Sequence, residues 1–145
     1  FSSIFWNTLW TNGQPPHTLG ILCNPQHPAL QSFPTNYFSD YQWQDAMSHA
    51  TALNLTYLGL KSTPIVRIID DWFTNRSLAL LFEVRVGKGR LLISGVDLLT
   101  ETDSRPEARQ LLHSLKQYMA SPAFQPVESM TVGEINAMFT DMPGK

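Results

Sequence analysis

The sequence has a single cysteine, Cys23, and no excess of basic residues. One cysteine excludes an intramolecular disulfide framework and a zinc site built from several thiolates. Ten basic against twelve acidic residues give a net charge of −2, which argues against binding to nucleic acid or to an anionic membrane surface. No apolar run approaches the roughly 20 residues that cross a bilayer. We therefore expect neither nucleic acid nor a membrane as a partner.

The abundant residues are apolar: hydrophobic residues make up 43% of the chain, and aromatic residues 11%. This content excludes an intrinsically disordered chain. A length of 145 residues suits one domain. The sequence starts at Phe1, without an initiator Met or a signal peptide. We therefore expect residues 1–145 to form a single domain that is a piece of a larger multidomain protein.

Short apolar runs alternate with segments of helical spacing along the chain. Residues 18–23 and 65–70 are apolar runs bounded by turn formers, which is typical of buried strands. Helical spacing predicts helices over residues 1–10 and about 41–53, a third between Ser104 and Pro122, and a short one after Thr131. Capping boxes are predicted for Ser39 with Gln42, Ser104 with Glu107 and Thr131 with Glu134. Three prolines predict an irregular but ordered loop over residues 24–36.

A β-hairpin over residues 78–96 is the most secure structural prediction. Residues 78–86 alternate in period two, which places Leu80, Phe82, Val84 and Val86 together on one face. Gly87, Lys88 and Gly89 predict a three-residue loop. The returning strand, residues 90–96, begins apolar on both faces, so we expect it to lie inside the sheet.

The order of these elements predicts an α/β layered domain with a mixed sheet. Only about four strands are visible, and a sheet covered by helices on both faces usually has more. We therefore expect the domain to be truncated at its N-terminus.

Cys23, His27 and Asp97 are candidates for a vestigial active site. Cys23 and His27 lie four residues apart, and a cysteine nucleophile needs a histidine base within hydrogen-bond reach. Free cysteine is among the most buried residue types, however, so we expect Cys23 to be buried and inert. Asp97 ends a strand, where a carboxylate can line a ligand crevice or fix the following turn. The four histidines are scattered without metal-ligand spacing, so no metal is expected.

A second set of candidate residues consists of two tryptophans and two polar residues near one of them. Trp10 precedes a turn, and Trp72 lies in the loop after the second apolar run. Indole rings anchor domain interfaces, fill cores and stack on sugar rings. Asp71 and Asn75 lie beside Trp72, and their side chains could bond sugar hydroxyls. We therefore take these four residues as a candidate carbohydrate site or domain interface.

Several strings resemble a known family over most of the chain, from Phe1 to about Pro126. They are FSSIFWNTLW, LGILCNPQHPAL, IIDDWFTNRSLALLFEVRVGKGRLLIS and RPEARQLLHSL. They are similar to the C-terminal region of large bacterial family 2 glycoside hydrolases, the β-galactosidase-like enzymes. The resemblance implies a flavodoxin-like, class I glutamine-amidotransferase-like fold, no cofactor, and a bacterial parent protein that is periplasmic or secreted.

The same resemblance implies that this chain lacks the catalytic residues. The family's catalytic glutamates belong to a (β/α)₈ barrel that the sequence does not contain, so no catalytic residue carries over. We expect a non-catalytic accessory domain that packs against the other domains of the parent glycosidase. Two alternatives remain: a carbohydrate-binding module that uses Trp10 or Trp72, and a small hydrolase that uses Cys23 and His27.

Overall fold

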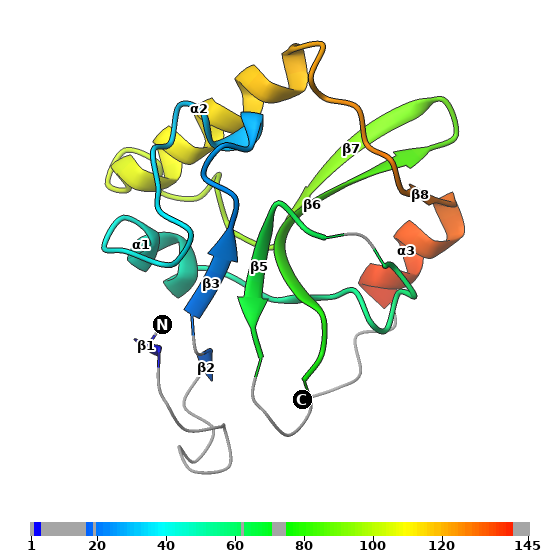
Figure 1. Cartoon of the computed structure of the whole chain (residues 1–145), viewed down its shortest axis with the longest axis horizontal. Coiled ribbons are helices and arrows are strands. Elements are labelled where there is room, and N and C mark those ends of the chain that lie inside the picture. The colour runs from blue at the N-terminus through cyan, green and yellow to red at the C-terminus, as the bar shows by residue number, and fades with distance from the viewer. Residues whose placement is uncertain (1, 4–16, 19, 62, 71–74, 141–145) are drawn as a thin grey trace.

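The computed structural model describes residues 2–3, 17–18, 20–61, 63–70 and 75–140. In this part of the chain an open, mixed sheet of six strands combines with helices, as the α/β prediction requires (Figure 1). The strands of this sheet are β3 (Gly20–Cys23), β4 (Leu53–Asn54), β5 (Val66–Ile69), β6 (Leu78–Val86), β7 (Gly89–Ser94) and β8 (Ser129–Met130). The helices are the 3₁₀ turn η2 (Pro28–Leu30), α1 (Trp43–Ser48), α2 (Pro106–Ala120) and α3 (Val132–Thr140). Apart from this sheet, β1 (Ser2–Ser3) pairs in parallel with β2 (His17–Thr18).

The long strand β6 organises the sheet, because four other strands pair with it. Leu81 has partners in both β5 and β7, and Arg85 has partners in both β7 and β8. Hence β5 and β8 lie on one side of β6, and β7 lies on the other. Strand β3 extends the six-stranded sheet beyond β5, and within this sheet all pairs except β6 with β8 are antiparallel. None of the helices in the described ranges is long and apolar enough to cross a membrane.

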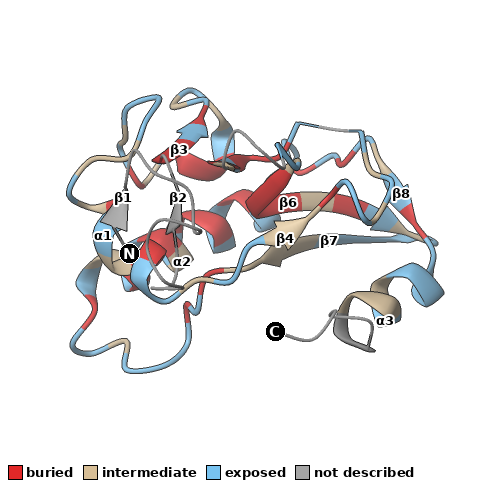
Figure 2. Cartoon of the chain, turned by 90° about the horizontal axis from the view of Figure 1, so that it is seen from below, coloured by how far each residue is buried: buried red, intermediate tan, exposed pale blue. Residues whose placement is uncertain are grey.

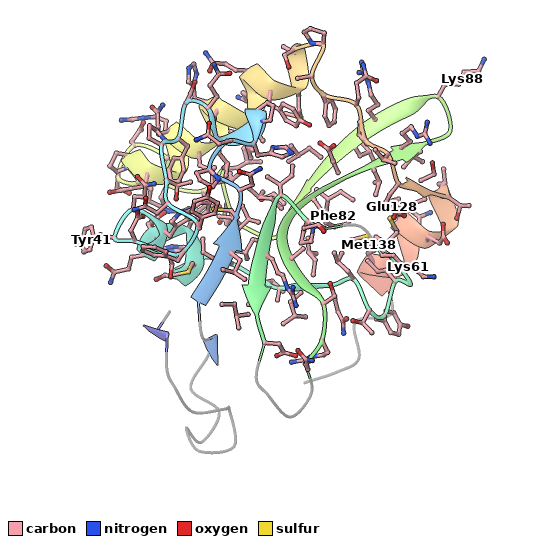
Figure 3. The ribbon with its side chains drawn as sticks, in the orientation of Figure 1. Tyr41, Lys61, Phe82, Lys88, Glu128 and Met138 are labelled. Carbon is pink, nitrogen blue, oxygen red and sulfur yellow. The ribbon has the colours of Figure 1, made fainter. Side chains whose placement is uncertain are left out.

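The two faces of the sheet carry separate hydrophobic cores. The larger core joins β3, β5 and β6 to η2, α1 and α2, and it contains Trp43, Leu111 and Leu115. The smaller core lies on the other face, where Phe82 and Val84 meet the 53–60 segment and α3. Figure 2 shows the buried residues gathered on β3, β6 and α2, with α1 and α3 at opposite ends of the molecule. Figure 3 shows Phe82 on the side of β6 toward Met138 of α3.

The prediction that Leu80, Phe82, Val84 and Val86 share one face is wrong for Leu80. Leu80 and Leu81 both pack in the larger core, whereas Phe82 and Val84 pack in the smaller one. The cause is a register shift between β5 and β6, where Val66 pairs with Leu81 but the next residue, Arg67, pairs with Ala79. An extra residue in one strand reverses the alternation beyond it.

The hairpin itself is confirmed, with β6 as predicted, but two of its details differ. The turn holds only Gly87 and Lys88, because Val86 already pairs with Gly89. Gly87 has φ +57°, a conformation that glycine adopts without strain. Contrary to prediction, β7 is not flanked on both sides: within the described residues it pairs with β6 alone, and Leu91 keeps 40% of its surface exposed. Its apolar character reflects contact with both cores, since Leu92 packs on the larger and Ile93 on the smaller.

The helix predicted over residues 41–53 is shorter, because the residues that follow α1 pair with another segment of the chain instead of continuing the helix. After α1 the chain becomes extended, and Ala50 forms an antiparallel bridge with Val96. Thr51 N–H donates to the carbonyl of Gly95 at 2.8 Å. A Cβ at Gly95 would lie 2.2 Å from the carbonyl oxygen of Thr51, so only glycine allows this close approach.

Only one of the three predicted capping boxes forms. At α3, Thr131 N–H donates to the Glu134 carboxylate at 2.6 Å, and Glu134 N–H donates to Thr131 Oγ1 at 3.2 Å. The box at Ser39 is absent because Gln42 Nε2 donates instead to the carbonyl of Pro34. At α2, Ser104 Oγ donates to the carbonyl of Glu101, and Arg105 takes the N-cap position before the helix begins at Pro106.

The helix predicted within residues 1–10, with Ser2 or Ser3 as its N-cap, has only these two serines among the described residues. Ser2 and Ser3 form strand β1, paired with His17 and Thr18. The remainder of that prediction lies outside the described residues.

Candidate functional site

Cys23 lies in β3 with only 8% of its surface exposed. Its Sγ donates to the carbonyl of Asn36 at 3.2 Å. Burial raises the pKa of the Cys23 thiol, so the reactive thiolate is disfavoured. These contacts place the cysteine in the larger core.

His27 caps the 3₁₀ turn η2 instead of approaching Cys23. Its Nδ1 accepts the N–H of Ala29 at 3.2 Å, and its ring packs edge-on against Tyr118 with centroids 5.4 Å apart. Burial lowers the pKa of His27, which favours the neutral ring. In the described part of the chain no hydrogen bond joins His27 to Cys23, so the structure does not bring these two candidates together as nucleophile and base.

Asp97 lies at the surface just beyond the end of β7. Its Oδ1 accepts the N–H groups of Leu99 and Thr100, each at 3.0 Å. These bonds lower the pKa of Asp97 to about 2. The carboxylate therefore fixes the turn that leads toward α2, which is the turn-forming alternative that its sequence position allowed.

Of the candidate interface residues, only Asn75 can be placed. Asn75 is exposed and has φ +46°, a left-handed conformation that asparagine tolerates better than most residues. Trp10, Asp71 and Trp72 lie outside the described residues.

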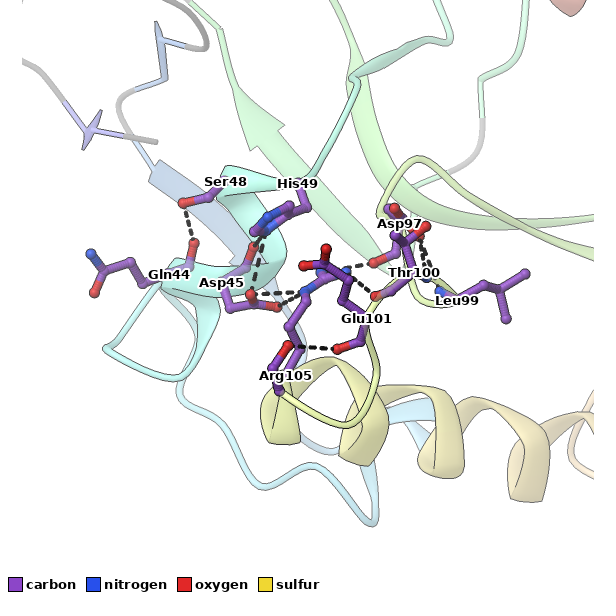
Figure 4. Close-up of polar contacts among 10 residues, drawn as sticks. Gln44, Asp45, Ser48, His49, Asp97, Leu99, Thr100, Glu101 and Arg105 are labelled. Atoms are coloured by element: carbon purple, nitrogen blue, oxygen red, sulfur yellow. Dashed lines mark hydrogen bonds and ion pairs between the residues drawn. The ribbon is translucent and has the colours of Figure 1, made fainter.

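An ion-pair network at the start of α2 was not predicted from sequence (Figure 4). Arg105, 6% exposed, donates through Nε to both carboxylate oxygens of Asp45, at 2.9 and 3.0 Å. Its two terminal nitrogens donate to the carbonyls of Thr100 at 3.0 Å and Asp97 at 2.8 Å. The hydrogen bond to Asp45 raises the pKa of Arg105. Sixty residues separate the two partners, so no local pattern could reveal the pair.

A second unpredicted cluster links α2 to the centre of the sheet. Tyr118 donates from its hydroxyl to the Glu83 carboxylate at 2.7 Å. Burial, and then Glu83, raise the pKa of Tyr118, so the phenol stays protonated. Phe124 packs edge-on against Tyr118, and Arg90 lies over the Phe124 ring at 5.5 Å. The cluster closes one end of the larger core and exposes no nucleophile.

An apolar hollow runs between β7 and α2, and we call it the β7 groove. It encloses about 370 Å³. Its lining comprises Leu92, Ser94, Val96, Asp97, Leu98 and Leu99 from β7 and the following turn, with Leu112, Leu115 and Met119 from α2. Leu99 and Met119 stay 78% and 39% exposed, so the groove is open to a partner.

A second hollow, of about 440 Å³, opens into the loop of residues 24–36. We call it the loop pocket, and it contains His27 among its lining residues. It shares no residue with the β7 groove. The described residues hold no group of three or more His, Cys, Asp or Glu side chains that could bind a metal ion.

Cys23→Ala is expected to destabilise the chain by about 1 kcal/mol, because a small buried side chain is truncated. Native Cys23 should also react slowly with a thiol reagent, since burial shields it and raises its pKa. Urea unfolding followed by circular dichroism measures the first effect, and a timed reaction with a chromogenic disulfide measures the second. Reaction at the rate of the urea-unfolded protein would contradict the structural role.

The model of one protein family, described as a domain of unknown function (DUF8487), matches residues 1–140. The match spans nearly the whole chain, so the chain belongs to this family. No curated protein matches the chain in sequence.

Proposed function

We propose that this DUF8487 domain is a non-catalytic accessory domain of a larger, β-galactosidase-like glycoside hydrolase, in which it docks onto neighbouring domains. The observation that carries the docking role is the open β7 groove. The resemblance of the sequence to the C-terminal region of family 2 enzymes supplies the identity of the parent. On this proposal the α/β layers are a variant of the flavodoxin-like, glutamine-amidotransferase-like fold.

The roles of four of the described carboxylates support the absence of catalysis. Glycoside hydrolysis needs two carboxyl groups that flank one scissile bond. Here Asp45 is paired with Arg105, Glu83 accepts from Tyr118, and Asp97 fixes a turn. Glu134 belongs to the capping box of α3. Each of these carboxylates therefore serves the fold.

The edge of β7 supports a docking role. Antiparallel pairing with β6 directs the N–H and C=O groups of alternate β7 residues outward, including those of Leu92. Natural edge strands are usually protected by charged side chains, especially lysine, by proline or by a bulge. The one charged residue of β7 (GRLLIS) is Arg90, whose side chain donates to the carbonyl of Phe124, and Leu91 beside the edge is 40% exposed. An apolar edge next to an apolar groove is a surface that a protein interface would cover.

The proposal predicts that the purified chain does not hydrolyse aryl β-galactosides or β-glucuronides, because it lacks a catalytic carboxylate pair.

The proposal also predicts that Leu99→Glu combined with Met119→Glu weakens docking, since two charges enter an apolar interface. In the full-length protein this double variant should inactivate severalfold faster on heating. In the isolated chain the free energy of unfolding should change by less than about 1 kcal/mol, because both side chains are exposed.

Val127→Glu is the matched control, because Val127 is 84% exposed and does not line the groove. It should leave the inactivation rate of the full-length protein unchanged. Turnover by the isolated chain would refute the non-catalytic role. An inactivation rate unaffected by the double variant would refute the groove as the docking surface.

A further inference from the structure

The loop of residues 24–36 is irregular, and side chains of α2 hold it in place. Ser114, 1% exposed, donates from its hydroxyl to the carbonyl of Ala29 at 2.7 Å and accepts the N–H of Ser32 at 3.1 Å. Gln110 donates to the carbonyl of Ser32, and Gln117 accepts from the Ser32 hydroxyl. Irregular loops fixed on a rigid scaffold often carry binding sites, because their polar groups are not used by secondary structure. The loop pocket is therefore preorganised.

The walls of the loop pocket combine polar and apolar groups, and its volume suits a small ligand. Three proline rings and the side chain of Leu30 contribute the apolar part. Its volume of about 440 Å³ lies within the range of roughly 300–1,000 Å³ that is usual for small-molecule sites.

Neutral polar groups of three side chains remain available at the loop pocket. Because Nδ1 of His27 accepts the N–H of Ala29, the proton of the neutral ring is assigned to Nε2, which is then a donor. The side-chain amides of Gln26 and Gln31 also line the pocket, and neither hydrogen-bonds to another described residue. Each amide offers both donors and an acceptor.

The charge of the lining restricts the class of ligand. The described lining residues of the loop pocket include neither lysine nor arginine, so an anionic ligand would find no counter-charge among them. They include no carboxylate either, which disfavours a metal ion or an amine. A purely apolar ligand would leave the amides without partners. A neutral ligand rich in hydroxyl groups satisfies all three conditions.

We propose that the loop pocket binds a terminal ring of a neutral saccharide. The amides of Gln26 and Gln31 and Nε2–H of His27 bond its hydroxyl groups, while its C–H face lies against the proline rings. The site is independent of the docking role, because its residues and those of the β7 groove do not overlap.

Titration calorimetry of the full chain with lactose, cellobiose and maltose tests this inference. At least one of these neutral disaccharides should bind saturably. Gln26→Ala combined with Gln31→Ala should weaken that binding about tenfold, because neutral hydrogen bonds from two side chains are lost. The matched control is Gln44→Ala, since Gln44 is exposed on α1 and does not line the pocket. It should bind like the unchanged chain.

His27→Asn provides a separate test, because asparagine can still cap η2 but lacks the Nε2 donor. It should also weaken binding, while the loss of the ring contact with Tyr118 lowers the melting temperature only slightly. Three results would overturn the proposal: no binding by any of the three sugars, binding unaffected by the glutamine double variant, or glucuronate binding as tightly as glucose. Loss of docking through the β7 groove variants leaves these binding measurements unchanged, so the two proposals fail separately.

Discussion

Phe82→Ala is expected to lower the free energy of unfolding by about 3–5 kcal/mol. Phe82 is 1% exposed at the centre of the smaller core, where it shares contacts with Leu55, Val84 and Met130. Its removal leaves a cavity that a rigid strand in the middle of the sheet cannot close. A domain of this size is usually stable by only about 5–15 kcal/mol, so the variant should be close to unfolding.

Urea unfolding followed by circular dichroism measures this loss. Phe82→Leu is the matched variant, and it should retain much of the stability because it fills most of the space. Hydrogen exchange on the unchanged chain should place the slowest amides in residues 80–84, the buried middle of β6, where Leu81 has partners in both β5 and β7. A loss below about 1 kcal/mol in Phe82→Ala would mean that the smaller core contributes little to stability.

Arg105→Ala is expected to cost about 2–3 kcal/mol. Removal of the guanidinium takes the Arg105 partner from Asp45, which keeps its contact with His49, and leaves the carbonyls of Asp97 and Thr100 without the Arg105 donors. Breaking a deeply buried ion pair costs about 3–5 kcal/mol. The Asp45 side chain keeps 20% exposure, so water partly replaces the lost partner and the loss should be smaller.

The same unfolding experiment distinguishes this network from ordinary surface charge. Arg109→Ala, on the exposed side of α2, should change stability by less than about 0.5 kcal/mol. Arg105→Lys keeps the charge but cannot make all four hydrogen bonds, so its loss should be intermediate. An Arg105→Ala variant as stable as Arg109→Ala would show that the network does not fasten α1 to the turn before α2.

Local patterns in the sequence predicted the elements whose causes are themselves local. Strands β5 and β6 lie where apolar runs and alternation place them, and α2 ends before Pro122. The capping box of Thr131 and Glu134 forms because both of its partners are three residues apart on one helix turn. The irregular loop of residues 24–36 follows from its prolines, which cannot continue a helix or a sheet ladder.

Contacts between segments distant in the sequence decided the features of the fold and of the candidate sites that local patterns did not predict. The end of α1 depends on the pairing of Ala50 with Val96, and the face of Leu80 depends on the register between β5 and β6. The surroundings of the candidate site residues also depend on contacts between distant segments. Cys23 and His27 are near in sequence, yet Asn36 and Tyr118 are their partners in space.

The sequence by itself therefore determined the mixed α/β character, the hairpin and the absence of a basic excess in the composition, because composition and short-range periodicity contain that information. Only the tertiary structure decided that, among the described residues, β7 has an open edge beside an apolar groove and the loop of residues 24–36 forms a pocket lined by uncharged side chains. Both features arise where α2 packs against segments remote in the chain. The side chains that meet at such a junction come from segments far apart in the sequence. A local sequence pattern does not show which of these segments will be in contact.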